Sequence, residues 1–137
     1  MALTLDSLNN TPVGNTTPST GVFTTMSTSG MYATIATKTA NYTLTTTDFT
    51  VLGNASGGAI TLTLPTAVGV SGQIYTLKKI DSSANVVTIA TTSAQTIDGQ
   101  SSYSLSLQYA GVQVQSNNSN WVIIDVIPAR NGVAGTF

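Results

Sequence analysis

The chain has 137 residues and a mass of 14.1 kDa, the usual size of one domain, and 41% of its residues are hydrophobic. Only 7% of the residues are charged, against roughly 25% in typical soluble domains, and the formal net charge is -1. Because binding to nucleic-acid phosphates requires clustered Lys and Arg side chains, this composition argues against a nucleic-acid partner.

The residue types that most enzymes and metal sites use are missing. The sequence contains no His, no Cys and no Glu, although general acid–base catalysis relies mostly on His, Glu or an Asp in a tuned pocket. A glycosidase needs two facing carboxylates, and the candidates Asp98 and Asp125 lie far apart in sequence, so we interpret them as turn or edge residues. We therefore predict no enzymatic activity, no metal site and no cofactor.

Membrane signals are missing from the sequence as well. No stretch reaches ~18 consecutive apolar residues, and the N-terminus lacks the basic start and apolar run of a signal peptide. We expect a protein that does not insert into a membrane and does not use the general secretory route.

The first element in chain order is an arm over residues 1–29. Its apolar residues follow no strand or helix period that would let the segment fold alone. We predict an extended arm whose apolar side chains contact another chain or another protein. The predicted contact residues are Leu3, Leu5, Leu8, Val13, Val22, Phe23 and Met26.

The second part, residues 30–137, has the composition of β-structure. Thr, Val and Ile are frequent, and β-branched residues favour strands. Residues 60–64, Ile-Thr-Leu-Thr-Leu, alternate apolar and hydroxyl side chains before Pro65, which predicts a half-buried antiparallel strand. Residues 103–107 and 112–115 show the same period of two.

Turn residues separate these runs. We predict hairpin turns at residues 54–58, 81–85 and 117–120, which are rich in Asn, Asp, Ser and Gly. Roughly eight short strands at regular spacing predict an all-β domain, a small antiparallel β-sandwich or barrel.

Two parts of the chain resemble a known class of proteins. Residues 10–25, Asn-Thr-Pro-Val-Gly-Asn-Thr-Thr-Pro-Ser-Thr-Gly-Val-Phe-Thr-Thr, resemble the "NTPIG, then TTPSTGxFTT" segment of tail fibres and head-attached fibres of tailed bacteriophages. Later segments resemble the small β knob at the ends of such proteins: residues 41–44, 60–65, 75–81, 87–89, 96–99 and 120–124. The resemblance implies a homotrimer in which extended low-charge arms wrap one another, with a knob at the C-terminal end.

Two roles in a virion follow from this resemblance. The first is a capsid-decorating protein, either a cement protein or a short head fibre or spike, whose arm docks on the major capsid protein or another virion protein. The second is a tail-fibre or adhesin tip that binds a host-surface glycan. Because the chain begins with Met and has one arm unit before the knob, we expect the first role, on the capsid exterior. A soluble sugar-binding module outside any virion would leave the arm unexplained.

Aromatic and basic residues supply the remaining binding candidates. Tyr103, Tyr109 and Trp121 could stack on sugar rings, and Tyr109 and Trp121 are the predicted glycan contacts. Trp121 opens a Val-Ile-Ile run, however, and this favours packing in the core. For the adjacent Lys78 and Lys79 we predict that one side chain has its aliphatic stem pointing inward and that the other has its ammonium group in solvent. The alternative is that these lysines contact an acidic patch of the capsid.

Overall fold

Nine β-strands make up the part of the chain that the computed structural model describes, residues 32–130. This range contains no helix, so none that could cross a membrane, and the predicted all-β class is confirmed. The strands are β1 (Ile35–Lys38), β2 (Tyr42–Thr43), β3 (Thr50–Gly53), β4 (Ile60–Thr63), β5 (Ile74–Lys79), β6 (Val87–Ala90), β7 (Ser102–Leu105), β8 (Gly111–Ser116) and β9 (Trp121–Ile127).

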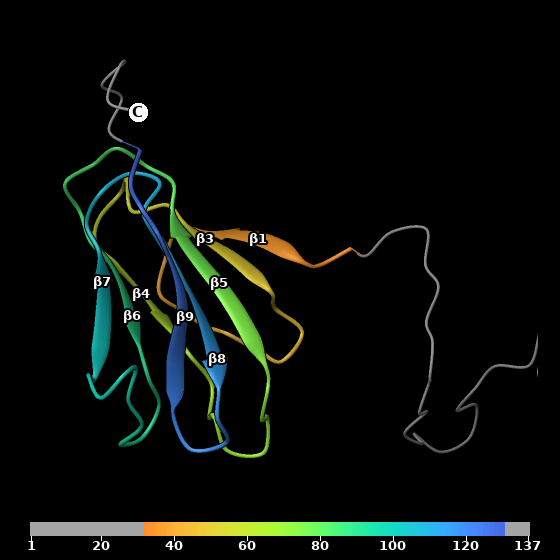
Figure 1. Ribbon diagram of the computed structural model, residues 1–137. Coiled ribbons are helices and arrows are strands. Elements are labelled where there is room, and N and C mark those ends of the chain that lie inside the picture. Colours follow the sequence, from red (N-terminus) through yellow and green to blue (C-terminus); the bar gives the residue numbers. More distant parts are fainter. Residues whose placement is uncertain (1–31, 131–137) are drawn as a thin grey trace, which may run out of the picture. The chain divides into compact units, whose positions relative to one another are not determined.

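The strands form two sheets, and the chain changes sheet at each step from β1 to β6 (Figure 1). The first sheet has the order β1-β3-β5-β8-β9, and the second has the order β2-β4-β6-β7. As a result β1, β3 and β5 run parallel to one another, and so do β2, β4 and β6. The last three strands, β7, β8 and β9, pair antiparallel with their neighbours.

This topology corrects two parts of the sequence prediction. The sheets are mixed rather than antiparallel, because β4 pairs parallel with both β2 and β6. The segments at residues 54–58 and 81–85 are not hairpin turns, since each carries the chain from one sheet to the other. The two sheets also do not close into a barrel: in the described range each ends in edge strands.

The third predicted turn is a hairpin, as expected. Residues 117–120 join β8 to β9, which pair antiparallel. The Asn117 N–H donates to the Asn120 carbonyl at 3.1 Å, and the Asn117 side chain accepts from the Ser119 and Asn120 amides. Local polar side chains close this turn, and a local sequence signal was therefore sufficient to predict it.

The core lies between the two sheets and follows the alternation of each strand. In β4, Ile60 and Leu62 are buried while Thr61 and Thr63 are half-buried. Side chains from both sheets join in one cluster, whose buried members all fall within residues 44–121. They are Leu44, Val51, Ala55, Ile60, Leu62, Leu64, Ala67, Tyr75, Leu77, Val87, Ile89, Ile97, Leu105, Val112, Val114 and Trp121.

Candidate interaction surface

The predicted contact residues of the arm, from Leu3 to Met26, lie outside the residues that the structure describes. Their contacts therefore stay a prediction. The remaining candidates fall within residues 32–130, and the structure places each of them.

Trp121 is a core residue. Its side chain is fully buried, its ring lies 5.3 Å from the Tyr75 ring, and its indole N–H donates to the Pro65 carbonyl at 3.2 Å. Both ring faces are enclosed, so Trp121 offers no surface to a sugar and the predicted glycan contact at this position is wrong. The structure instead shows Trp121 packed in the core, as the neighbouring Val-Ile-Ile run indicated.

Tyr109 remains available at the surface. Its side chain is 41% exposed, and its backbone has a φ of 65°, in the left-handed region that non-glycine residues adopt uncommonly. The Tyr109 amide donates to the Lys79 carbonyl at 2.8 Å, which holds the turn in this conformation. The Lys78 ammonium lies 5.7 Å from the centre of the Tyr109 ring, within cation–π range.

The two adjacent lysines lie on opposite faces of β5, as predicted. Lys78 is half-buried on the outer face, whereas Lys79 points inward and is fully buried. Sequence analysis anticipated an inward stem, but it missed the partner of the charge. The Lys79 ammonium donates to Asp81 Oδ1 at 2.6 Å, and Asp81 itself is 8% exposed.

Asp81 ties the two sheet-crossing segments together. Its carboxylate accepts hydrogen bonds from the Ala55 amide at 2.7 Å, from the Ser83 amide at 3.0 Å and from the Ser83 hydroxyl. Desolvation raises the pKa of Asp81, but the hydrogen bonds from Lys79, Ser83 and Ala55 lower it by more, so the pKa lies well below its usual 3.8. The group is saturated with protein donors, which indicates a structural role.

The two aspartates considered for glycosidase chemistry have structural surroundings. Asp98 and Gly99 form a turn with φ values of 46° and 81°, and Asp98 Oδ1 accepts from the Ile123 amide at 3.1 Å. Asp125 lies exposed on the edge strand β9. Among residues 32–130, no group of three His, Cys, Asp or Glu side chains is placed to hold a metal ion.

The feature with binding potential is the open side of the sandwich between β7 and β9. One inward-facing row crosses the first sheet through Val51, Leu77, Val112 and Val126. The first three side chains are completely buried, but Val126 is 51% exposed. The first sheet has five strands and the second only four, and the described chain therefore leaves Val126 without cover.

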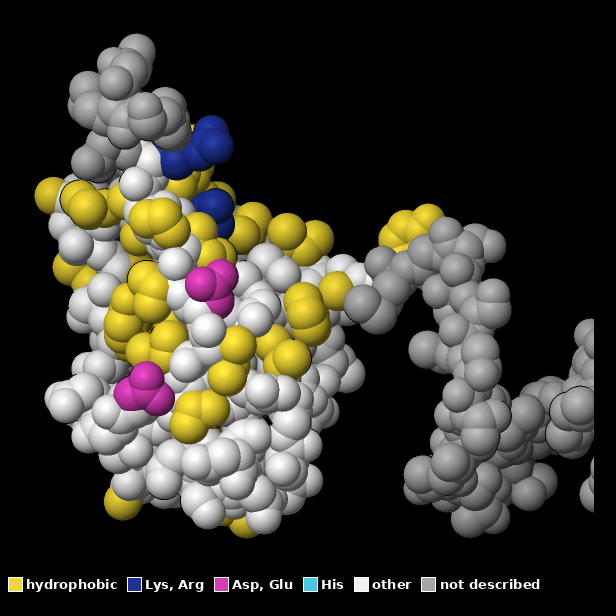
Figure 2. All heavy atoms as spheres, viewed as in Figure 1, with side chains coloured by type: hydrophobic (Ala, Val, Ile, Leu, Met, Phe, Trp, Pro, Cys, Tyr) yellow, Lys and Arg dark blue, Asp and Glu magenta, His cyan; other side chains and the backbone are white. Residues whose placement is uncertain are grey.

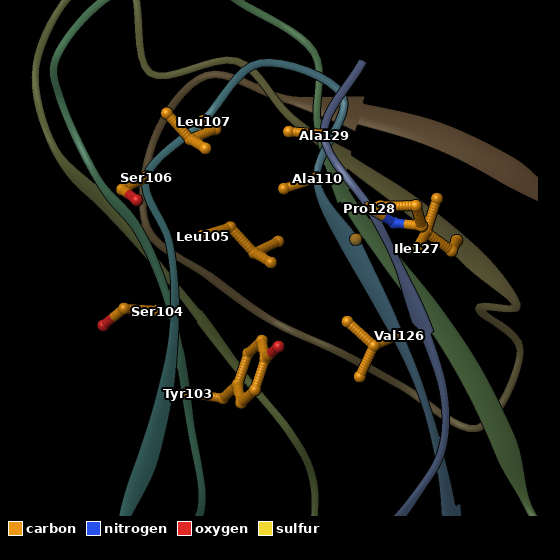
Figure 3. A pocket seen from close by; sticks show the side chains of 11 residues that line it. Tyr103, Ser104, Leu105, Ser106, Leu107, Ala110, Val126, Ile127, Pro128 and Ala129 are labelled. Atoms are coloured by element: carbon orange, nitrogen blue, oxygen red, sulfur yellow. The ribbon is translucent and has the colours of Figure 1, made fainter. Parts of the chain in front are cut away.

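A shallow hollow lies beside Val126 at this opening. Figure 3 shows Tyr103 and Leu105 on β7 facing the side of β9, while Ser104 points away from it. The hollow measures about 160 Å³, below the roughly 300–1,000 Å³ of small-molecule pockets, so it suits a protein side chain better than a free ligand. The lining residues are Tyr103, Ser104, Leu105, Ser106, Leu107, Ala110, Gly111, Val126, Ile127, Pro128 and Ala129.

Exposed apolar side chains continue around the hollow, and Figure 2 shows hydrophobic groups gathered on this face. Two of the lining residues, Leu107 and Val126, are 56% and 51% exposed. Covering them would contribute roughly 2 kcal/mol of apolar burial, at about 1 kcal/mol for the exposed half of each side chain. We call Tyr103, Leu107 and Val126, with the hollow between them, the β7/β9 opening.

Sequence analysis missed the β7/β9 opening. Leu105 and Val126 are both apolar residues that face inward from their strands, yet Leu105 is buried and Val126 is exposed. This difference in exposure arises because one sheet has five strands and the other has four, which is a property of the whole topology. The run Ile-Ile-Asp-Val-Ile in β9, apolar on both faces, is the one local signal that could have marked an unusual strand.

Comparison with known proteins gives no family: no protein-family model matches the chain, and no curated protein sequence matches it significantly.

Proposed function

We propose that this chain is a non-enzymatic structural protein of a bacteriophage virion, a homotrimeric capsid-decorating protein of the cement or short head-fibre type. The observation that carries the proposal is the segment at residues 10–25, with its resemblance to phage fibre arms, ahead of a small all-β unit. Residues 1–29 would anchor the protein, and residues 30–137 would form the projecting knob.

The chemistry of the described unit supports a binding role over a catalytic one. Asp81 is occupied by Lys79 and Ser83, Asp98 holds a turn, and Asp125 stands on an edge strand. Leu107 and Val126 expose apolar side chains at the β7/β9 opening, and apolar surface of this kind suits contact with protein. These features fit a protein whose work is to hold its place in an assembly.

The mechanism that we propose is strand addition by the arm. Backbone hydrogen bonds would fix the arm on the shell or on its sister arms, while Leu3, Phe23 and the other apolar arm residues add burial. Three copies would also gain from multivalency, because one bound arm holds the other two at high effective concentration.

Deletion of residues 1–29 tests the anchor. The core cluster lies within residues 44–121, so the truncated protein should keep its β-sheet circular dichroism spectrum. We expect it to be missing from purified particles of the phage that encodes it, where electron microscopy and quantitative mass spectrometry would count its copies. A matched control replaces residues 10–25 with the same residues in scrambled order and should also fail to attach.

Two results would count against this proposal. If the truncated or scrambled protein occupies particles at the normal copy number, the arm is not the anchor. If the full-length protein is found at a few copies at the tail tip, the capsid role is wrong and the adhesin role replaces it.

One observation favours that second role, a tail-fibre or adhesin tip that binds a host-surface glycan. Tyr109 presents an exposed ring from a backbone conformation that is rarely adopted, beside the Lys78 ammonium. A glycan array with the purified protein tests it. Binding that is lost in Tyr109→Ala and kept in Tyr32→Ala, which also removes an exposed ring, would support the adhesin; no binding to any glycan would oppose it.

A further inference from the structure

The outer face of the first sheet carries two rows of side chains that cross all five strands. Residues paired across adjacent strands project on the same face, opposite to the buried Val51, Leu77 and Val112. The row that we call the Lys78 row consists of Thr37, Leu52, Lys78, Gly111 and Ile127. The row that we call the Gln113 row consists of Ile35, Thr50, Thr76, Gln113 and Asp125.

Lys78 has apolar neighbours in its row. Leu52 lies on one side of it and Gly111 on the other. A Cβ atom on Gly111 would lie 3.2 Å from Ile127 Cδ1, so the Ile127 side chain covers the glycine. Within residues 32–130 the structure gives Lys78 no carboxylate partner, since the one ion pair in that range joins Lys79 to Asp81. A cation in such a surrounding suits an anionic ligand that also has apolar surface.

The turn before β8 holds the Tyr109 ring beside this cation. The Tyr109 amide donates to the Lys79 carbonyl at 2.8 Å, the Lys79 amide donates to the Ala110 carbonyl at 2.9 Å, and the Gln108 side chain donates to the Ile80 carbonyl at 3.0 Å. These bonds fix the turn to the end of β5. The exposed ring therefore has a defined position before any ligand binds, which lowers the entropy cost of binding.

The Gln113 row adds neutral hydrogen-bonding groups to the same face. Thr50, Thr76 and Gln113 are all half-buried, and the Gln113 amide donates to the Thr76 hydroxyl at 3.1 Å. Hydroxyl and amide groups of this kind both donate and accept hydrogen bonds. They match a ligand that is rich in hydroxyl groups.

Exposed charge is divided along this face. Lys78 is the next-to-last residue of β5, and the exposed Arg130 follows the end of β9. β5 and β9 run in the same direction because each is antiparallel to β8. The basic groups in Figure 2 lie toward the end of the sheet where these two strands finish. Asp125 lies in the Gln113 row instead, so an anionic group is attracted to the Lys78 row and repelled from the β9 side of the other row.

We propose that the outer face of the first sheet binds an acidic oligosaccharide, one that carries a carboxylate. A sugar ring stacks on Tyr109, the carboxylate meets the Lys78 ammonium, and hydroxyl groups of the sugar bond to Thr76 and Gln113. The neutral polar row favours a sugar over an acidic peptide, because it offers partners for hydroxyl groups. This inference rests on glycan binding, the second role proposed above, and names the class of ligand.

A glycan array with the full-length protein tests the class of ligand. The array contains glycans with uronic or sialic acids and their neutral counterparts, and we expect binding to acidic members alone. Lys78→Met keeps the apolar stem but removes the charge, and should weaken binding to the best acidic glycan by about tenfold or more. The matched control is Lys38→Met, which removes a cation that lies 3.5 Å from the centre of another ring, that of Tyr42. This control should bind as the natural sequence does.

The possible results separate this inference from the role on which it rests. Binding to neutral glycans alone, or acidic binding that Lys78→Met leaves unchanged, would overturn the inference and leave a glycan-binding role in place. No binding to any glycan would remove both. A polyaspartate peptide that binds as tightly, with the same dependence on Lys78, would assign the face to an acidic protein instead.

Nuclear magnetic resonance of the natural sequence gives a second readout that needs no variant. Titration with the best acidic glycan should shift the amide signals of Lys78, Tyr109 and Gln113. Binding without shifts at these positions would place the ligand elsewhere and overturn the inference, whatever the variants do.

Discussion

At the scale of single residues, the buried Lys79–Asp81 ion pair is a point where one substitution would strongly affect the described unit. Lys79 is fully buried, and its 2.6 Å contact with Asp81 neutralises it inside the protein. A buried ion pair adds little compared with well-packed apolar residues, but removing one partner leaves an uncompensated charge in the core. Asp81 also fixes Ala55 and Ser83 on the two segments that cross between sheets.

Asp81→Asn should therefore destabilise the protein strongly. The substitution keeps the size of the side chain but leaves the Lys79 ammonium without a counter-charge, at an expected cost of about 3–5 kcal/mol in the free energy of unfolding. Urea denaturation followed by circular dichroism measures it. Asp125→Asn, on an exposed strand position, is the matched control and should change stability by less than about 0.5 kcal/mol; equal losses in the two variants would refute a special role for Asp81.

Stability should also fall in acid, because the pKa of Asp81 is lower in the folded protein than its usual 3.8. The stabilisation from this depressed pKa is complete above the unfolded value and is lost as the pH falls below it. Asp48 contributes in the same direction. Desolvation raises its pKa, but hydrogen bonds from Thr45 and Tyr42 together lower it by more, so that its pKa also lies below the usual value. Urea midpoints should therefore stay level above about pH 5 and drop steadily between about pH 5 and pH 2.

The Asp81→Asn variant provides the control for this pH dependence. It lacks the carboxyl group, so its urea midpoint should fall less over the same pH range than that of the natural sequence. An unchanged pH dependence in the variant would show that Asp81 is not the titrating group.

At the scale of strands and sheets, the two parallel sets β1-β3-β5 and β2-β4-β6 must pass close together where the chain crosses between them. Gly53 ends β3 at such a point. A Cβ atom there would lie 2.8 and 2.9 Å from the two methyl carbons of Val87, which is itself fully buried in β6. The close approach of β3 to β6 therefore requires a residue without a side chain.

Gly53→Ala should destabilise the domain by about 1–3 kcal/mol, because the β-branched Val87 has little freedom to move aside. Thermal unfolding measures the effect. Gly57→Ala is the matched control, since its Cβ would meet no atom within 4 Å, and it should change stability little. If Gly53→Ala unfolds at the same temperature as Gly57→Ala, the sheets are not packed as tightly as described.

How much of the structure the sequence predicted depends on how local each feature is. The alternation in residues 60–64 correctly indicated a strand with Ile60 and Leu62 inward, and the Asn-rich turn at 117–120 correctly indicated a hairpin. The segments at 54–58 and 81–85 have similar turn residues but cross between sheets. A turn sequence specifies a reversal of the chain, whereas the choice of sheet depends on distant partners such as Asp81 and Ala55.

The same distinction separates the parts of the candidate surface. Neighbouring apolar residues were enough to identify Trp121 as a core residue. The exposure of Val126 was not predictable, because it follows from five strands in one sheet facing four in the other.

At the scale of the whole molecule, we propose that the chain works in an assembly with other chains. The described unit has a buried core, few charges and an apolar opening between β7 and β9. Residues 1–29 carry the phage-like segment and a set of apolar residues without a regular period. A segment with this composition gains most from folding when several chains contribute to one structure, and we therefore expect the homotrimer to be the stable form.

The most direct test is the mass of the full-length protein in solution, measured by sedimentation equilibrium over a range of concentrations. We predict a mass close to three times the chain mass of 14.1 kDa, and we expect the trimer to persist on dilution. A protein that sediments at the mass of one chain at every concentration would contradict the proposed assembly and, with it, the virion role.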